Sequence, residues 1–357
     1  MNQTSLNRSL TTLSLLGFAA PSIIMMVFMS LYTIVDGIFI SRFVGSNALS
    51  SLNIVYPMIS VVIAIATMFA TGGNAIVSRY LGQGQEKQAR KALTEFVVIG
   101  VLISTVFAVL VILFENPICR FLGANDELMA DCKAYLTISM LFAPACTLQT
   151  LFQSYFVTAS RPGLGLWLTV AAGILNAVLD YVLIVPIPLG IAGAALATGF
   201  GQLLPAVVGL IFFAIPRKTL RFCRFSFRPR EIRDACINGS SEMIGQMATA
   251  ITTFLFNIIL MRLAGSDGVA AMTILFYGQF LFNAFYLGFA IGIAPVVGYQ
   301  YGAGNRRELR KIYRISFLFT VISSIAMTAA SIILATPIVS VFTKEPETFA
   351  LADAGFK

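Results

Sequence analysis

Residues 9–41, SLTTLSLLGFAAPSIIMMVFMSLYTIVDGIFIS, form a long run between Arg8 and Arg42 whose one charged side chain is Asp36. A helix that crosses a bilayer needs about 20 mostly apolar residues, so this run is long enough to span a membrane. A carboxylate at that depth is costly in lipid and is expected to face protein or a water-filled cavity. Asp36 is therefore the first candidate functional residue.

The composition of the whole chain predicts an all-α integral membrane protein. Hydrophobic residues make up 58% of the chain, charged residues 11%, and the mean hydropathy is +0.86. A soluble domain carries about 25% charged residues. We predict about nine membrane-spanning helices from the long apolar stretches. These stretches are 12–40, 50–76, 95–114, 134–157, 164–185, 190–215, 237–261, 269–298 and 315–335.

The basic residues cluster in the loops that follow the even-numbered predicted spans. Loops rich in Lys and Arg stay in the cytoplasm, so these loops and the amino terminus are expected there. The net charge is +8 and the pI about 9.4, but no basic face interleaved with aromatic residues is present. Nucleic acid is therefore not an expected partner, whereas the lipid bilayer is. The basic loop residues are Arg79, Lys87, Arg90, Lys91, Arg161, Arg217, Lys218, Arg221, Arg224, Arg228, Arg230, Arg233, Arg306, Arg307, Arg310, Lys311 and Arg314.

Other motifs exclude several kinds of site. The first span lacks a short apolar region with a small-residue cleavage site, so it is expected to be a retained helix. The five cysteines form no CxxC pair and the chain has no histidine, so neither a metal site nor a cofactor is predicted. Cys119 and Cys132 share an outer loop, but spacing alone is weak evidence for a disulfide. The turns at 82–84 and 302–304 lack the Lys-Ser/Thr of a phosphate-binding loop.

Residues 42–91 match residues 262–311 without a gap, at one constant offset that sets position 42 against position 262. Polar and glycine positions in loops coincide, which a shared hydrophobic composition would not cause. The sequence therefore predicts an internal duplication. The matched pairs include Arg42/Arg262, Gly45/Gly265, Ser46/Ser266, Phe69/Phe289, Ala70/Ala290, Gly72/Gly292, Gly82/Gly302, Gly84/Gly304, Arg90/Arg310 and Lys91/Lys311.

The duplication predicts two parallel-repeat helix bundles. An even number of spans separates the copies, so both are expected to cross the membrane in the same direction, with six helices in each bundle. At the same offset, Lys357 corresponds to Thr137, so the second bundle would lack its last three helices. A natural nine-helix protein is the alternative, but it would leave packing faces unpaired. We predict a six-helix lobe at 1–217, a cytoplasmic basic linker at 218–236 and an incomplete second lobe at 237–357.

Three acidic residues fall well inside predicted spans: Asp36 in the first, Asp180 in the fifth and Glu242 in the seventh. The first and fifth spans run in the same direction, so Asp36 and Asp180 are expected at similar depth and in one cavity. Tyr32 and Asn176 each precede one of these aspartates by four residues and share its helical face. Desolvation and a neighbouring carboxylate both disfavour the ionised form, so we predict that the pocket binds a proton or sodium.

Thr198 in the sixth span is expected to add a hydroxyl group to this pocket. Alternatively, these polar groups are hydrogen-bonded contacts that join helices. That alternative fits Asn176 or Thr198 alone, but it fits two aspartates poorly because no intramembrane Lys or Arg neutralises them. For Glu242, a solvated position near the cytoplasmic helix end and an inward-facing site both remain open.

The candidate substrate cavity combines both halves of the chain. Tyr32 and Met29 lie on the first span, and methionines suit promiscuous sites, although lipid or core packing also explains them. Pro21 removes one backbone hydrogen bond about four turns before Asp36 and predicts a kink, either fixed or a moving hinge. The second half offers uncharged polar residues suited to a hydrated passenger: Gln246, Asn257, Tyr277, Gln279 and Asn283.

The segments Asn176-Ala-Val-Leu-Asp180 and Gly190-Ile-Ala-Gly-Ala-Ala-Leu-Ala-Thr198, with Asp36 and the repeated Gly-x-Gly turns, resemble the multidrug and toxic compound extrusion (MATE) family. The likeness covers the whole chain, without the family's last three helices, and is greatest to bacterial members of the DinF and MepA-like type. It implies a V-shaped pair of six-helix lobes in the bacterial inner membrane. Such a protein exports organic cations and other drugs in exchange for protons or sodium.

The resemblance also implies roles for particular residues. Helix 1 would bend at Pro21, and Glu242 would match a family acid on helix 7 whose partner acid would lie beyond Lys357. The cation-linked pocket would consist of Asp36, Asn176, Asp180 and Thr198.

A lipid-linked saccharide flippase of the wider superfamily is the alternative function. Such a protein would line its cavity with basic residues for pyrophosphate, whereas every Arg and Lys in this chain lies in or beside a predicted loop. An enzyme is not expected, because the chain has no histidine, no metal cluster and no recognisable pair of nucleophile and base. We expect a monomer that carries small molecules.

Overall fold

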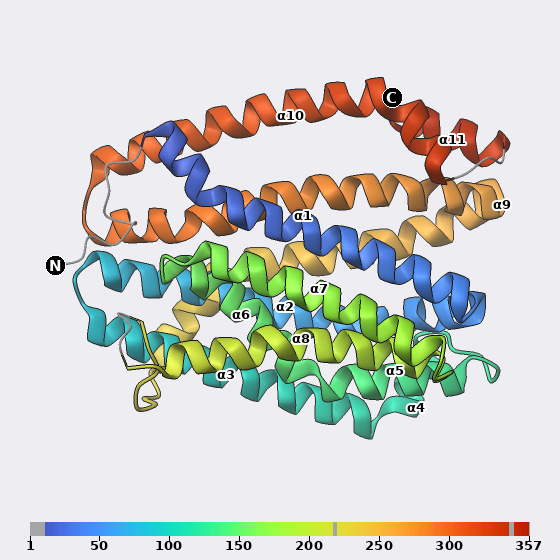
Figure 1. The fold of residues 1–357 in the computed structure, drawn as a ribbon, viewed down its shortest axis with the longest axis horizontal. Helices are drawn as coiled ribbons and strands as arrows, with labels where there is room; N and C mark the ends of the chain where they lie inside the picture. Colours follow the sequence, from blue (N-terminus) through green and yellow to red (C-terminus); the bar gives the residue numbers. More distant parts are fainter. Residues whose placement is uncertain (1–10, 217–219, 343–345, 357) are drawn as a thin grey trace.

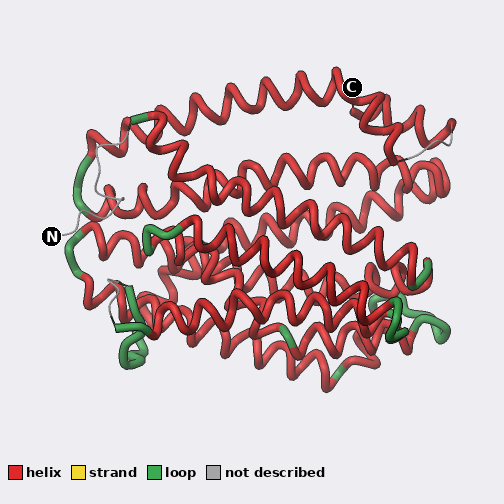
Figure 2. The backbone as a smooth tube through the Cα atoms, viewed as in Figure 1, coloured by secondary structure: helices red, strands yellow, loops and turns green. Residues whose placement is uncertain are grey.

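A computed structural model describes residues 11–216, 220–342 and 346–356; some side chains within these ranges are not described, most of them between 253 and 270. The described residues form eleven helices and no strand, which confirms the all-α class (Figure 2). The helices are α1 (Thr12–Phe43), α2 (Ser46–Gly82), α3 (Glu86–Leu113), α4 (Glu115–Phe121), α5 (Met129–Leu141), α6 (Ala143–Thr158), α7 (Pro162–Ile184), α8 (Ile191–Ala214), α9 (Pro229–Gly302), α10 (Arg306–Phe342) and α11 (Pro346–Phe356).

Most loops gather at two opposite ends of the long helices (Figure 2). One end, which we call the basic end, carries the start of α1, the α2–α3 and α9–α10 turns and the segment 220–228 (Figure 1). The opposite end carries the α1–α2 turn, the loop 122–128 and the α7–α8 connection. The two ends therefore correspond to the two sides of a membrane.

Among the described residues, the number of membrane spans agrees with the prediction. Seven helices are long and apolar enough to cross a membrane, or eight if the bent pair α5 and α6 forms one span. The remaining predicted span, 237–261, the seventh along the chain, falls in the first part of α9, where many side chains are not described. The predicted span 134–157 is bent by 51° rather than straight. Pro144 lies in the first turn of α6, where it cannot continue the hydrogen bonding of α5.

Helix α9 reverses its direction along its length. Gly239 near its start lies against Met68 of α2, and Gly302 at its end lies against Arg79 of the same helix. In a straight helix, Gly239 and Gly302 would be about 95 Å apart, whereas Met68 and Arg79 are about 17 Å apart. The two parts of α9 therefore lie side by side as two spans, and Figure 1 shows the turn at the end opposite the basic one.

The first half of the chain encloses two buried apolar clusters. The cluster nearer the basic end contains packed phenylalanine rings, with Phe152 stacked on Phe213 at 5.4 Å between ring centroids. Leu220 and Ala235, from the predicted linker, are buried in this same cluster. The segment between the two halves is thus packed into the core of the first half.

The ends of α2 and α9 meet at the basic end through glycines. Gly82 lies against the backbone of Tyr299, and Gly302 lies against the backbone of Arg79. Each contact is the image of the other in the register of the duplication, so the structure has the symmetry that the duplication predicts. An added Cβ at either glycine would overlap the opposite backbone. Small residues therefore allow the two halves to approach closely at this end.

Candidate functional site

Asp36 on α1 and Asp180 on α7 meet inside the first half. Their carboxyl groups lie within hydrogen-bonding reach of each other. Asp180 is 2% exposed, whereas Asp36 is half-buried. In both groups the Oδ1 atom is buried without a hydrogen-bond partner. The two aspartates that the sequence placed at similar depth thus share one pocket.

Two glycines set the spacing of the helices around this pocket. A Cβ added to Gly173 of α7 would lie 2.8 Å from the ring of Phe28 and 3.3 Å from the ring of Tyr32, so glycine lets α1 pack closely on α7. A Cβ added to Gly201 of α8 would lie 3.2 Å from Cβ of Asn176. The close approach of α1, α7 and α8 brings their polar side chains together.

The predicted partners of the aspartates lie in the same region. Asn176 donates a hydrogen bond from Nδ2 to Oγ1 of Thr198 at 3.5 Å. The hydroxyl group of Tyr32 lies near both Gln149 of α6 and Asp36. Four helices, α1, α6, α7 and α8, therefore contribute polar groups to the pocket.

Tyr135 of α5 is a part of the pocket that the sequence reasoning missed. Its hydroxyl group lies within electrostatic reach of both Asp36 and Asp180 and close to Ser139. Gln149 was missed as well. The available signal was the set of polar residues that Tyr135 and Gln149 form within the predicted span 134–157, together with residues such as Ser139 and Gln153.

A cavity of about 40 Å³ adjoins the pocket. A buried water needs at least about 10–15 Å³, so this space holds about three or four waters at most. The lining includes apolar side chains of α2, α5 and α6. Its polar lining residues are Tyr135, Ser139, Cys146, Thr198 and Gln202. The cavity therefore offers polar contacts beside a pair of acids.

The chemistry of the pocket suits a single positive ion. An ionised carboxylate only accepts hydrogen bonds, so a hydrogen bond between Asp36 and Asp180 requires one proton on the pair. Among the described residues, neither aspartate forms an ion pair with Lys or Arg. A cation that approaches the pair can therefore compensate the charge left when the proton departs.

Met29 faces the interior of the first half. Its sulfur accepts a hydrogen bond from Nε2 of Gln153 at 3.8 Å, and Gln153 also donates to Oγ1 of Thr169 at 3.3 Å. Met29 thus lies on the side of α1 that contacts α6.

The polar residues that the sequence predicts for the cavity in the second half differ in how exposed they are. Gln246 and Tyr277 are half-buried, Gln279 and Asn283 are exposed, and the side chain of Asn257 lies outside the described residues. Their role in a substrate cavity stays a prediction.

Pro21 and Glu242 both lie inside helices. Pro21 is within α1, which continues without interruption from Thr12 to Phe43. Glu242 is half-buried in α9, between Gly239 and Gly245. The hinge role of Pro21 and the site role of Glu242 stay predictions.

The cysteines of the outer loop are not bonded to each other. Cys119 and Cys132 are both free and buried. Burial, with the nearby Cys132 thiol, raises the pKa of Cys119 to about 11. Cys119 is therefore an unreactive thiol at neutral pH.

Comparison with known proteins identifies the family. The sequence matches the MatE family over residues 21–182 and 243–355, more than half of the chain. The chain belongs to the MatE family. Its relatives include Multidrug export protein MepA of Staphylococcus saprophyticus, 24% identical over 313 residues that cover 87% of this chain and 69% of that protein. MepA of Staphylococcus haemolyticus is 22% identical over 341 residues, 95% of this chain and 75% of that protein.

Several solved structures share the fold of this MatE protein. A structure titled as the outward-facing conformation of a multidrug resistance MATE family transporter matches with a TM-score of 0.92 and 19% identity, covering all of this chain and 80% of that one. A MATE in complex with MaD3S matches with a TM-score of 0.90 and 20% identity, over 99% of this chain and 80% of that one. The MatE chain is a multi-pass membrane transporter and not an enzyme.

Proposed function

We propose that this chain exports organic cations and other drugs across the bacterial inner membrane in exchange for protons. The observation that carries the proposal is the pair of carboxyl groups, Asp36 and Asp180, that lie within hydrogen-bonding reach of each other in a pocket without a basic partner among the described residues. Buried acids inside membrane bundles are typical of proton relays and ion pathways. The names of the MepA relatives support drugs as the exported class.

The two aspartates have different roles in this mechanism. Asp180 is almost fully buried and holds the proton within the pair, whereas the half-buried Asp36 is the group that an entering cation reaches. A drug cation binds the deprotonated pair. Protonation removes the charge that attracts the drug and so releases it.

Competition between proton and drug couples exchange to movement. A ligand shifts a conformational equilibrium only by its different affinities for the two states. When drug and proton bind alternately to the same pair, each favours a different orientation of the two halves. Alternating access follows, with the basic end on the cytoplasmic side, as the Lys-rich and Arg-rich loops predict. The chain acts as a monomer in this proposal.

The lipid-linked saccharide flippase is less well supported. Recognition of pyrophosphate calls for cationic side chains in the cavity. Among the described lining residues of the small cavity beside the aspartates, none is Lys or Arg.

A transport assay distinguishes the coupling ion. Purified protein in liposomes is given ethidium together with either a proton gradient or a sodium gradient of equal size. We expect ethidium transport with the proton gradient and none above the protein-free background with sodium alone. A nearly isosteric variant, Asp180→Asn, serves as the control without the proton-holding group. Full transport on sodium alone would exclude the proton as the coupling ion, and transport under neither gradient would contradict coupled export.

A further inference from the structure

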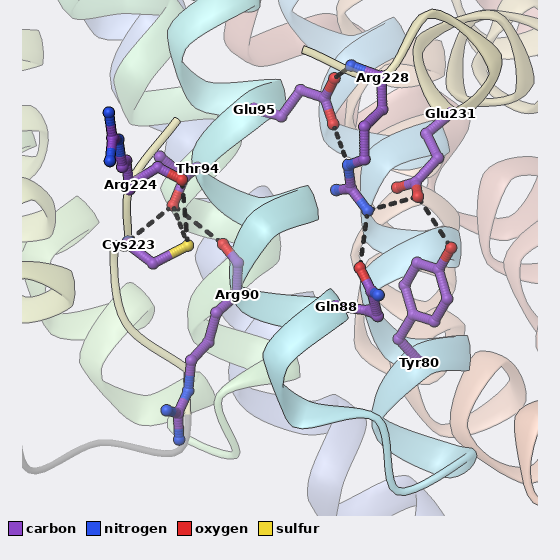
Figure 3. Close-up of polar contacts among 9 residues, drawn as sticks. All are labelled: Tyr80, Gln88, Arg90, Thr94, Glu95, Cys223, Arg224, Arg228 and Glu231. Atoms are coloured by element: carbon purple, nitrogen blue, oxygen red, sulfur yellow. Dashed lines mark hydrogen bonds and ion pairs between the residues drawn. The ribbon is translucent and has the colours of Figure 1, made fainter. Parts of the chain in front are cut away.

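The chain between α8 and α9 crosses the basic end as a segment without helix or turn, residues 221–228. The N–H of Phe222 donates to the carbonyl oxygen of Phe213 on α8 at 2.8 Å. The N–H of Cys223 donates to Oγ1 of Thr94 on α3 at 3.0 Å, as Figure 3 shows. The backbone of this segment is therefore held against two helices of the first half.

A buried ion pair fixes the end of the segment (Figure 3). Glu95 of α3 is fully buried, and its carboxylate accepts from both the backbone N–H and the Nε atom of Arg228. The guanidinium group also contacts Glu231 and Gln88. Loss of one partner would leave a buried charge without compensation, so this attachment resists separation. The segment is thus fixed in place near both of its ends.

Two phenylalanine rings of this fixed segment are directed outward. Phe225 is 45% exposed and Phe227 is 66% exposed, whereas Phe222 packs against the apolar cluster nearer the basic end. Exposure of an aromatic ring to water is unfavourable, but aromatic rings are enriched at the level where lipid headgroups meet the hydrocarbon. The depth of the segment in the membrane therefore decides what covers these two rings.

The length of α3 places the segment at that level. This helix has 28 residues and is about 42 Å long, whereas the hydrocarbon core of a bilayer is about 30 Å thick. At the outer end the charged pair of Glu115 and Lys133 follows α3 directly, so the excess of about 12 Å lies at the basic end. From Glu86, the first residue of α3, that distance reaches Thr94, the residue to which Cys223 is bonded.

Basic side chains without an acidic partner surround the two phenylalanines. The neighbouring acids each pair with an arginine in the part of the chain that the structure describes. These pairs are Glu86–Arg90, Glu95–Arg228, Glu231–Arg228 and Asp234–Arg233. The exposed basic residues of α3 and of positions 221–230 that form no ion pair among the described residues are Lys87, Lys91, Arg224 and Arg230.

The two lysines lie further out from the membrane centre than the segment does. Lys87, Lys91 and Thr94 follow one another at spacings of four and three residues, so they share one face of α3. Lys91 is about 5 Å and Lys87 about 10 Å beyond Thr94 along the helix axis. The headgroup layer is about 5–8 Å thick on each side of the hydrocarbon. Both lysine side chains therefore reach the layer that lipid phosphates occupy.

We propose that residues 224–230, with Lys87 and Lys91, form a docking site for an anionic phospholipid of the leaflet at the basic end. Phe225 and Phe227 contact the first methylene groups of its acyl chains. The basic side chains contact its phosphate, which arginine binds through two parallel N–H donors. Because the backbone of the segment is already fixed, little ordering of the protein opposes binding.

Charge determines which phospholipid the site prefers. A zwitterionic headgroup carries its own cation beside the phosphate, so it gains less from the unpaired lysines and arginines. Each Lys or Arg near an anionic lipid surface favours association by about fivefold. The site is thus expected to select phosphatidylglycerol, which has net negative charge, over phosphatidylcholine.

A single fluorescent reporter tests this selection. The chain has one tryptophan, Trp167, so a Trp167→Phe background removes all other indole fluorescence. Phe227→Trp then adds an indole to the segment. The protein is reconstituted in phosphatidylcholine vesicles that contain equal small fractions of either brominated phosphatidylglycerol or brominated phosphatidylcholine. Bromine quenches indole fluorescence on contact, so quenching measures which lipid occupies the site.

We expect the apparent binding constant of phosphatidylglycerol at this reporter to be at least about fivefold that of phosphatidylcholine. Equal quenching by the two lipids would overturn the proposal. Quenching by neither lipid would show that something other than lipid covers the segment, and would overturn it as well. The measurement uses neither an ion gradient nor a drug, so its outcome is independent of the proposed transport mechanism.

Paired substitutions locate the preference on the segment. Arg224→Gln with Arg230→Gln is expected to lower the preference to less than about twofold. Arg306→Gln with Arg307→Gln is the matched control, because it removes the same charge from exposed positions at the start of α10 in the second half. The control is expected to keep the full preference. Equal loss in both double variants, or loss in neither, would contradict a docking site on this segment, and thermal unfolding confirms that both variants fold.

Discussion

Replacement of Asp36 by asparagine is expected to lower ethidium transport at least about 30-fold, since loss of one member of a buried charged contact costs about 2–5 kcal/mol. The asparagine amide has nearly the same size as the carboxyl group, so helix packing and membrane insertion are expected to persist. It cannot bind and release a proton at Asp36, which removes the exchange on which the proposed mechanism depends. Transport in liposomes and thermal unfolding in detergent measure the two effects separately.

The matched control for this variant is Asp126→Asn. Asp126 is an exposed acid in the loop 122–128 and pairs with Arg120 at the surface. Surface ion pairs contribute about 0–1 kcal/mol, so transport and stability are expected to change little. Asp36→Asn with transport equal to that of Asp126→Asn would remove Asp36 from the mechanism.

Replacement of Gly302 by alanine is expected to reduce transport about 5- to 150-fold, because overpacking of about 1–3 kcal/mol shifts a conformational equilibrium by that factor. The added Cβ would overlap the backbone oxygen of Arg79, which cannot move away as a flexible side chain can. The arrangement with the basic end closed is therefore destabilised relative to one in which α2 and α9 separate there. Gly82→Ala meets Tyr299 in the symmetric contact and is expected to have the same effect.

Gly245→Ala is the matched control on the same helix. No atom lies within 4 Å of a Cβ added there, so this variant is expected to transport within about twofold of the unmodified protein. The distance between spin labels on cysteines introduced at the exposed positions Leu102 of α3 and Tyr313 of α10 provides the second readout. We expect a larger fraction of molecules with an open basic end in Gly302→Ala. Unchanged distances and transport in Gly302→Ala would show that this glycine contact is not part of the moving interface.

The sequence was sufficient for the fold class because the bilayer restricts the possible structures so strongly. A run as long and apolar as residues 9–41 has few alternatives to a spanning helix, since its backbone groups must be paired within the segment. The duplication predicted two bundles in the same orientation, and the paired contacts of Gly82 and Gly302 in the structure follow its register. The bend at Phe142 was missed, although Pro144 was visible, because a proline in a span can produce a kink, a break or a tolerated irregularity.

The pocket was predictable in part for a related reason. Asp36 and Asp180 are buried charges on spans that run in the same direction, so depth alone brought them together. The positions of Tyr135 and Gln149 depend on how α5 and α6 are rotated about their axes, and the span 134–157 carries too many other polar residues to single these two out. The ion pair between the buried Glu95 of α3 and Arg228, with 3.0 Å between Oε2 and Nε, was missed as well. Glu95 lies at the end of a predicted span near basic residues, and Arg228 is far away in the sequence.

The number of protons released when ethidium binds tests the central claim most directly. Binding heats measured in buffers with different ionisation enthalpies give this number for the purified protein and for the double variant Asp36→Asn, Asp180→Asn. We predict release of about one proton per bound cation at a pH where the pair carries a single proton, and no release from the double variant. Binding without proton release in the unmodified protein, or equal release in the double variant, would contradict the account.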